Sequence, residues 1–261
     1  MGDENMHIPD GYLGPATWIV LFLVMLVIWF FAFRNGNRNL GPRNVPMLSF
    51  MAALSFILMM FNLPIPDGTS AHMVGAVLIA IVLGPYGATI ALTIALLIQA
   101  LLFGDGGITA YGANVFNMGV VMPFTGILVY IAARKAMAGR KNRIFGTESR
   151  KRAIAAFAAG YIGIVIAAVT TAVEFGIQPT IAPGYAPYGL DLAIPAMLFA
   201  HLLVGVAEGL TTAIVIYYLS ENRSDLLNLV KFCPHWLEKY MEKAPVPVPV
   251  GPQHTERGGV K

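Results

Sequence analysis

The chain has 261 residues, of which 57% are hydrophobic and only 12% are charged, and its mean hydropathy is +0.68. Since a soluble globular domain carries roughly 25% charged residues, this composition argues against that class and predicts a membrane protein. The net charge of +3, from 17 Lys and Arg against 14 Asp and Glu, is too small to indicate nucleic-acid binding. A single cysteine, Cys233, excludes an internal disulfide and a Cys-x-x-Cys zinc site.

Apolar stretches follow one another along most of the chain, and each approaches the roughly 20 residues that cross about 30 Å of hydrocarbon. We place membrane spans at 16–33, 46–63, 70–85, 86–103, 110–133, 153–176 and 192–219. The third and fourth spans are separated by Gly84-Pro85-Tyr86-Gly87, which predicts a tight turn and not one kinked helix. The predicted fold is therefore an all-α bundle of seven transmembrane helices.

The positions of the basic residues predict the orientation of this bundle. All 17 Lys and Arg lie within 34–43, within 134–152 or after 222, and seven crossings bring these regions to one side of the membrane. Because Lys and Arg mark cytoplasmic loops, the N-terminus is predicted to lie outside and the C-terminus in the cytoplasm. No basic residue precedes the first span, which argues against a cleavable signal peptide.

Composition divides the chain into four regions. They are an outer N-terminal segment at 1–15, a transmembrane domain at 16–220, a cytoplasmic amphipathic helix at 221–243 and a Pro-rich disordered tail at 244–261. Apolar residues such as Leu226 and Trp236 alternate with charges in the third region, which predicts a helix on the inner membrane surface or on a partner.

Two histidines on the predicted outer side are candidates for a binding site. His7 lies in the segment Met6–Tyr12, where no basic residue would repel a cation. His72 is expected to open the third helix, with Thr69 or Ser70 as its N-cap. Both can reach one outward-facing cavity, although spacing alone favours ordinary interfacial histidines.

Further polar residues are expected near this outer face or inside the bundle. His201 and Glu208 are seven residues apart, so they share one face of the last span. A polar network that fixes helix packing is favoured over direct ligation, and their spacing matches no zinc-hydrolase motif. The residues expected to surround or support the site are Thr69, Ser70, Gln99, Asn114, His201 and Glu208.

Four ordered segments resemble the CbiM/NikM family, the substrate-binding components of energy-coupling factor transporters for cobalt and nickel. They are MHIPDGYLGP at 6–15, PIPDGTSAHMVGAVLIAIVLGP at 64–85, GDGGITAYGANVFNMGVV at 104–121 and AHLLVGVAEGLTTA at 200–213. The resemblance extends from about Met6 to Tyr218. It implies a seven-helix subunit whose N-terminal segment folds back into the bundle to complete a metal site.

In that family the ligands match Met6, His7 and His72 here. An α-amine, an amide nitrogen and two imidazoles would supply four nitrogens, a square-planar set that suits Ni(II) or Cu(II) and is poor for Mg(II) or Ca(II). The resemblance thus implies no permanent cofactor and Ni(II) or Co(II) as the transported ligand. Nickel is favoured, because MHIPDG is more similar to the nickel-type members.

The chain departs from the family pattern at its start. Residues 1–5 precede Met6, whose nitrogen is then a peptide nitrogen and not a free amine. We expect translation to begin at Met6, while removal of the extension or a different donor set are the open alternatives.

By the same resemblance, the protein is not an enzyme and resides in the plasma membrane of a prokaryote. It lacks an ATP-binding Walker A loop, so the implied partners are a transmembrane coupling subunit, ATP-binding subunits and a small accessory membrane subunit. The pairs Ala76/Ala80 and Ala91/Ala95 are candidate surfaces for close helix packing, within the chain or against a partner. The main alternative is a stand-alone secondary transporter or channel, for which no inverted repeat is visible. A membrane enzyme is a second alternative, but the chain shows no nucleophile–base pair.

Overall fold

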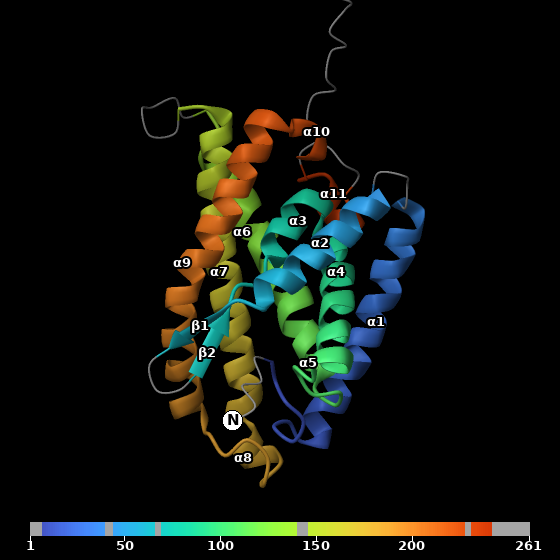
Figure 1. Ribbon diagram of the computed structural model, residues 1–261, viewed down its shortest axis with the longest axis vertical. Helices are drawn as coiled ribbons and strands as arrows, with labels where there is room; N and C mark the ends of the chain where they lie inside the picture. Colours follow the sequence, from blue (N-terminus) through green and yellow to red (C-terminus); the bar gives the residue numbers. More distant parts are fainter. Residues whose placement is uncertain (1–6, 40–43, 66–68, 140–145, 228–230, 242–261) are drawn as a thin grey trace, which may run out of the picture.

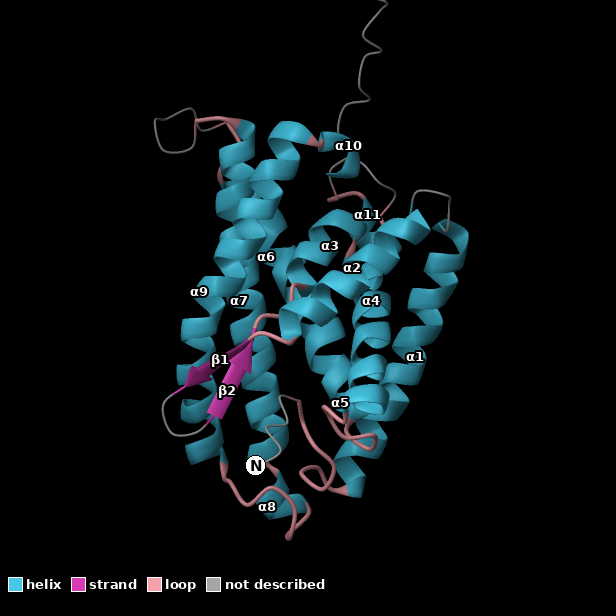
Figure 2. Ribbon diagram, viewed as in Figure 1, coloured by secondary structure: helices cyan, strands magenta, loops and turns pink. Residues whose placement is uncertain are grey.

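The computed structural model describes residues 7–39, 44–65, 69–139, 146–227 and 231–241, and it shows a helical bundle with one small hairpin (Figures 1 and 2). The first half contains α1 Pro15–Asn39, α2 Asn44–Met59, β1 Asn62–Ile65, β2 Thr69–His72, α3 Ala76–Leu83, α4 Pro85–Ile98 and the π-helix η1 Gln99–Phe103. The second half contains α5 Tyr111–Phe116, the π-helix η2 Asn117–Val121, α6 Met122–Ala136, α7 Glu148–Gly176, α8 Gln178–Ile181, α9 Leu190–Asn222, α10 Ser224–Leu227 and α11 His235–Glu238.

Several helices are long and apolar enough to cross a bilayer. Among the described residues these five stretches are Pro15–Gly36, Pro85–Phe103, Tyr111–Ala136, Glu148–Ile181 and Leu190–Asn222. The α2 helix is apolar but has only 16 residues. The chain is therefore a multi-pass membrane protein in which some helices are shorter than the bilayer core.

The prediction of one continuous helix over 70–85 is wrong. Thr69–His72 pairs with Asn62–Ile65 as an antiparallel hairpin, with His72 opposite Asn62. The sequence has a proline within β1, Pro64, and another directly after it, Pro66, and they disfavour helix because proline lacks a backbone donor. The α3 helix that follows has only eight residues and is about 12 Å long.

The short α3 helix lies inside the bundle. Every one of its residues is buried, and Gly84 ends it with a positive φ of 88°. The predicted turn between the third and fourth spans is thus confirmed. Non-helical backbone near membrane depth is tolerated where protein surrounds it, which explains how the hairpin and the short helix coexist.

The alanine pairs lie within this interior. Ala76, Ala80 and Ala91 are fully buried, and Ala95 is 1% exposed. They allow close packing of helices inside this chain. The proposal that they form a docking surface for another subunit is therefore wrong.

The region 221–243 is not one continuous helix. It contains two four-residue helices, α10 and α11. Between them, Phe232 is hydrogen-bonded to the α3–α4 junction: the Phe232 amide donates to the Leu83 carbonyl at 2.6 Å, and the Phe232 carbonyl accepts from the Tyr86 amide at 2.9 Å. Phe232 and Leu237 are fully buried in the main core. Phe232 and Leu237 thus pack on the bundle itself, whereas Trp236 is 55% exposed. The predicted tail at 244–261 lies outside the described residues.

The two ends of the bundle differ in character. The end of α6, the start of α7, α10 and α11 share one end, whereas the N-terminal segment and α8 lie at the other (Figure 1). The described basic residues of 134–139, 146–152 and 231–241 belong to the first end. The segregation of charge expected from the sequence is therefore present in the folded chain.

Candidate metal centre

Residues 7–14 fold back against the end of the bundle, and Ile8 is their anchor. The Ile8 amide donates to Asn114 Oδ1 at 3.0 Å, and Asn114 Nδ2 donates to the Ile8 carbonyl at 3.1 Å. The Gly107 amide donates to the same carbonyl at 2.8 Å. Both polar backbone groups of this buried residue are satisfied, so the segment is held in one register against α5 and the loop before it.

The glycine loop fits closely around this segment. A Cβ atom on Gly107 would lie 2.3 Å from the Asp10 amide nitrogen, and Gly106 has a φ of +94°. The Asp10 carboxylate accepts from the Thr109 amide at 2.8 Å and the Ile108 amide at 3.1 Å. The absence of side chains on these glycines is what lets the loop close over the segment.

The fold brings the two candidate histidines together. His7 and His72 are 5% and 7% exposed, and the centroids of their rings lie 4.9 Å apart at an interplanar angle of 86°. Because metal–imidazole bonds are about 2 Å long, one nitrogen from each ring can reach a shared ion at this separation. His72 occupies the last position of β2, which places it beside a residue 65 positions earlier in the chain.

The hydrogen bonds of the two rings differ. His7 Nε2 lies 3.1 Å from Gln99 Oε1 and 3.6 Å from Asp105 Oδ2, whereas His7 Nδ1 is buried without a hydrogen-bond partner among the described residues. His72 Nδ1 lies 3.2 Å from the Met73 carbonyl. A proton on that Nδ1 fixes the tautomer in which Nε2 carries the lone pair, the arrangement common to metal-binding histidines.

The electrostatics of His7 favour a neutral ring. Burial lowers the pKa of His7 below its ordinary value, and this effect exceeds the opposing influence of the Asp105 carboxylate and the Gln99 hydrogen bond. A neutral imidazole is the form that binds metals.

Glu208 supports the segment that carries His72. Its carboxyl oxygens accept from the Val74 amide at 2.9 Å and the Gly75 amide at 3.0 Å, and Glu208 is only 1% exposed. The predicted cap by Thr69 or Ser70 is wrong, because the N-cap of α3 is Gly75, which has no side chain that could cap the helix. Glu208 from α9 provides acceptors for these amides instead.

His201 does not join this arrangement through its described hydrogen bond. Its Nδ1 lies 2.8 Å from the Met197 carbonyl of its own helix. The described hydrogen bonds of His201 and Glu208 therefore go to different segments, although both residues lie on α9.

The remaining candidates from the sequence are Thr69, Ser70 and Met6. Thr69 and Ser70 belong to β2, and their side chains lie outside the described residues. Met6 also lies outside them.

Three polar residues near the site were not singled out by sequence reasoning. Asp10 holds the loop, Asp105 Oδ1 accepts from the His7 amide at 3.3 Å, and Gln178 Oε1 accepts from the Gly14 amide at 2.9 Å. Asp10 and Asp105 could have been found, since each lies within a Gly-containing polar motif. Gln178 gave no signal, because its contact joins segments 164 residues apart.

Side-chain donors are few at this centre. Within the described ranges, no three His, Cys, Asp or Glu side chains converge as a metal-binding group. The pair of imidazoles is the donor set that the described side chains provide, and further donors would come from the backbone or from Met6. Imidazole nitrogen donors suit a transition metal better than Mg(II) or Ca(II).

The fold and this centre define a multi-pass membrane protein with a buried pair of histidines suited to a transition metal. The chain belongs to the CbiM family: residues 7–226 match the model described as the cobalt uptake substrate-specific transmembrane region. The protein is therefore a relative of cobalt and nickel transport proteins.

Individual relatives agree with this assignment. The chain is 49% identical to MJ1569 of Methanocaldococcus jannaschii, a protein named for metal transport, over 85% of this chain and 94% of that protein. It is 46% identical to the fused nickel transport protein NikMN of Rhodobacter capsulatus over 85% of this chain, but it spans only 64% of that longer protein. It is 31% identical to the cobalt transport protein CbiM of Ruminiclostridium cellulolyticum, over 83% of each chain.

Solved structures show the same fold. A truncated transition metal transporter is 45% identical, has a TM-score of 0.74 and covers 83% of this chain and 99% of that chain. A second transition metal transporter is 42% identical with the same TM-score, over 90% and 97% of the two chains. The archaeal and bacterial relatives fit a membrane protein of a prokaryote.

Proposed function

We propose that this chain captures Ni(II), in preference to Co(II), as the substrate-binding subunit of an energy-coupling factor transporter. The observation that carries the proposal is the buried contact between His7 and His72, with their ring centroids 4.9 Å apart. The unbonded His7 Nδ1 gives this pair a lone pair that no protein donor occupies among the described residues. The names of the relatives, which cover both nickel and cobalt transport, support the substrate class.

The proposed donor set is the amine of Met6, the amide and imidazole nitrogens of His7, and the imidazole of His72. The first donor requires a chain that begins at Met6. The His7 amide donates to Asp105 Oδ1 at 3.3 Å, so ligation through this nitrogen requires that bond to break as the amide loses its proton. Four nitrogens favour a square-planar ion, which is why nickel is the proposed substrate.

We also propose seven passes through the membrane, with the metal centre outside and the basic end in the cytoplasm. The long helices supply five passes. We propose that α2, with 16 residues, and the hairpin together with α3, with eight residues, supply the other two, with extended backbone covering the distance that the short helices do not. The basic residues gathered at one end support this orientation by the positive-inside rule.

Energy for uptake is proposed to come from partner ATP-binding subunits through a transmembrane coupling subunit, with a small accessory membrane subunit. Relatives named as fused nickel transport proteins support a role for additional parts, since this chain matches 64% of their length. The alternative, a stand-alone carrier, predicts Ni(II) uptake into liposomes by this chain alone in an ion gradient.

Calorimetric titration with Ni(II) and Co(II) tests the metal centre. The chain that starts at Met6 is expected to bind Ni(II) more tightly than the chain with residues 1–5, and His7→Ala and His72→Ala are each expected to abolish binding. His201→Ala is the matched control, because its described hydrogen bond stays within its own helix. Normal binding by both histidine variants would overturn the proposed site, and tighter Co(II) binding would overturn the choice of nickel.

A further inference from the structure

A buried pair of polar side chains lies one helical turn further into the bundle than the contacts that hold the N-terminal segment. Asn117 begins η2, just after Asn114, and Glu174 lies near the end of α7, just before Gln178. Asn117 Nδ2 donates to Glu174 Oε2 at 2.8 Å. Asn117 is 3% exposed and Glu174 is 6% exposed. A carboxyl group is thus enclosed by protein within one of the stretches long enough to cross a bilayer.

Each of these two side chains has one oxygen that no hydrogen bond satisfies. Glu174 Oε1 and Asn117 Oδ1 are both buried without a hydrogen-bond partner among the described residues. Both atoms are acceptors, and the bond from Nδ2 to Oε2 already holds their two groups together. Turning the Asn117 amide over would place two acceptors against each other at that bond, so the present orientation is the favourable one. The pair therefore lacks an electron-poor partner, which is either a metal cation or a proton.

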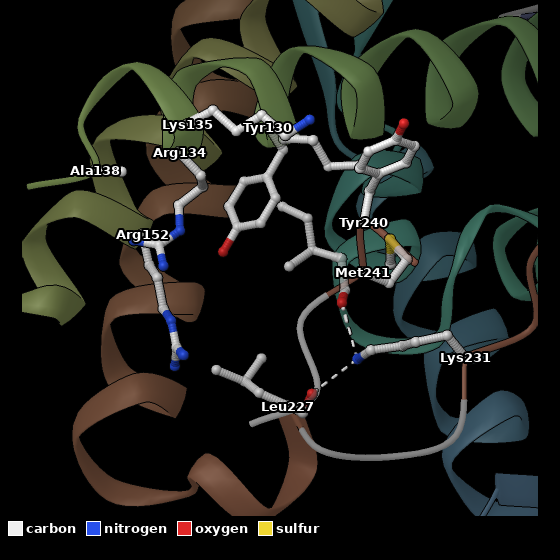
Figure 3. Close-up of a pocket in the computed structure, with 11 residues that line it drawn as sticks. Tyr130, Arg134, Lys135, Ala138, Arg152, Leu227, Lys231, Tyr240 and Met241 are labelled. Atoms are coloured by element: carbon white, nitrogen blue, oxygen red, sulfur yellow. Dashed lines mark hydrogen bonds between the residues drawn. The ribbon is translucent and has the colours of Figure 1, made fainter. Parts of the chain in front are cut away.

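The basic residues of the chain lie far from Glu174. All Lys and Arg belong to 34–43, to 134–152 or to the chain after 222. Figure 3 shows four of them around a pocket at the basic end of the bundle, namely Arg134, Lys135, Arg152 and Lys231. On α7 itself, Arg152 precedes Glu174 by about 33 Å, since an α-helix rises about 1.5 Å per residue. Within the described ranges no ion pair balances the charge of this carboxyl.

The ionisable groups of the elements packed against α7 are bonded elsewhere or lie at other levels of the bundle. The η2, α3 and α8 elements contain no ionisable side chain, and α6 has its own in its last two turns. On α9, Asp191 lies in the exposed first turn, and the described bonds of His201 and Glu208 go to Met197, Val74 and Gly75. In the N-terminal segment, the ring of Tyr12 packs on Phe175, and His7 and Asp10 bond to the loop side of the metal centre. No described hydrogen bond or ion pair joins any of these groups to Glu174.

The pair also joins the two supports of the N-terminal segment. Asn114, one turn before the amide of the pair, binds both backbone groups of Ile8. Gln178, one turn after the carboxyl of the pair, accepts from the Gly14 amide at 2.9 Å and donates to the Glu174 carbonyl. The hydrogen bond between the amide and the carboxyl therefore connects the supports of both ends of the segment through the interior.

We propose that the carboxyl of Glu174 is a proton-binding site, in which Oε1 carries the proton and donates it to Asn117 Oδ1. One proton then satisfies both unpartnered oxygens and removes the buried negative charge. A proton needs no cavity, whereas Mg(II) needs about six oxygen ligands and this pair offers two free oxygens. Loss of the proton leaves a carboxylate beside an unsatisfied acceptor, so the two supports should separate and loosen the N-terminal segment.

Infrared spectroscopy of the full chain in detergent, without metal, tests the proton site. A protonated carboxyl has a C=O stretching band that a carboxylate lacks. This band should be present at pH 7 in the wild-type spectrum minus that of Glu174→Gln, and it should disappear reversibly on alkaline titration. Glu148→Gln is the matched control, because it removes an exposed carboxylate that pairs with Arg134, and its difference spectrum should show carboxylate bands alone. Since no metal is added, this result does not depend on the proposed metal function.

Two further measurements separate the proton from its structural effect. Asn117→Leu keeps the acid but removes the acceptor of its proton, so the band should shift in frequency and remain, even if Glu174→Gln does not fold. A glutamine at 174 can form both hydrogen bonds and has no proton to lose. Above the pH at which the band disappears, the Ile8 and Gly14 amides should therefore exchange with deuterium about tenfold faster in the wild type than in Glu174→Gln, and below it within about twofold.

Three results would overturn the proposal. Absence of the protonated band over the whole titration, in the wild type and in Asn117→Leu, would show that Glu174 is ionised. Loss of the band on addition of sodium or magnesium chloride at constant pH would assign the two oxygens to a metal cation. Equal exchange of the Ile8 and Gly14 amides in the wild type and Glu174→Gln at alkaline pH would show that the proton does not hold the N-terminal segment.

Discussion

Removal of the Glu208 carboxyl should weaken metal binding indirectly, through the backbone that follows His72. Two buried amides, those of Val74 and Gly75, depend on this one group, at 2.9 and 3.0 Å. An amide left buried without an acceptor costs about 1–3 kcal/mol, so Glu208→Ala should destabilise the protein by about 2–6 kcal/mol. Glu208→Gln keeps one acceptor oxygen and should cost about 1–3 kcal/mol.

The effect should extend to the metal centre because Val74 is two residues from His72. Thermal unfolding in detergent measures the loss of stability, and calorimetry with Ni(II) measures affinity. We expect at least tenfold weaker binding in Glu208→Ala, equivalent to about 1.4 kcal/mol, and a smaller loss in Glu208→Gln. His201→Ala, on the same helix, should change neither quantity much. Unchanged affinity in a destabilised Glu208→Ala protein would show that Glu208 stabilises α3 without positioning His72.

Three further predictions concern the loop, its acid sensitivity and the C-terminal segment. Gly107→Ala would place Cβ 2.3 Å from the Asp10 amide nitrogen and should destabilise the protein by about 1–3 kcal/mol in a denaturation assay; normal stability would show that the loop yields. Burial opposes ionisation of Asp10, but hydrogen bonds from 108–110 lower its pKa below 3.8. The stability that these hydrogen bonds give should therefore be present above pH 3.8 and be lost as the pH falls through the lower pKa of the folded state. Asp10→Asn should remove this acid sensitivity in a pH series of unfolding curves. Burial raises the pKa of the Cys233 thiol to about 11, so its alkylation at pH 8 should be slow. In Gly84→Ala the new Cβ would meet the carbonyl of the neighbouring Phe232 at 2.6 Å, so the segment that carries Cys233 must shift and alkylation of Cys233 should be at least tenfold faster. Gly139→Ala has a similar positive φ with open space around it, and it should leave the rate unchanged.

The long helices could be predicted because hydrophobic length determines them. The stretches 16–33, 153–176 and 192–219 all lie within helices of the folded chain. Their exact ends extend further, since polar residues continue a helix beyond the hydrocarbon region without a change in hydropathy. Lengths of apolar sequence thus predict the scaffold, but only to within several residues at each end.

The stretch 70–85 shows where hydropathy alone fails. Its residues are apolar enough for a span, yet the first three belong to a strand and the helix begins only at Ala76. Apolar composition reports that a segment is buried, and it does not report whether protein or lipid surrounds it. Pro64 and Pro66 indicate an extended backbone at this place, but the long apolar run that follows them led to the prediction of a helix.

The closeness of the two candidate histidines and several of the polar residues around them could be predicted, but the backbone groups that those polar residues bind could not. His7 and His72 were identified from family motifs, and Gln99 and Asn114 from their position near a Gly-rich loop. The contact of Glu208 with Val74, 134 residues away, depends on how α9 packs beside the hairpin. Contacts of this range leave no mark in the spacing of a single sequence.

The irregular backbone around the centre explains why the site and the failed predictions coincide. An extended segment after His72 leaves the Val74 and Gly75 amides unpaired with their own chain, and so Glu208 of another helix can bind them. A regular helix over 70–85 would satisfy those amides internally and would remove this link. The π-helix at Gln99 similarly ends where the Asp105 amide donates back to the Gln99 carbonyl at 3.1 Å, so one irregular turn connects both partners of His7. The breaks in helical geometry are therefore the means by which helices distant in sequence hold the two histidines together, which is why rules for regular elements fail at this place.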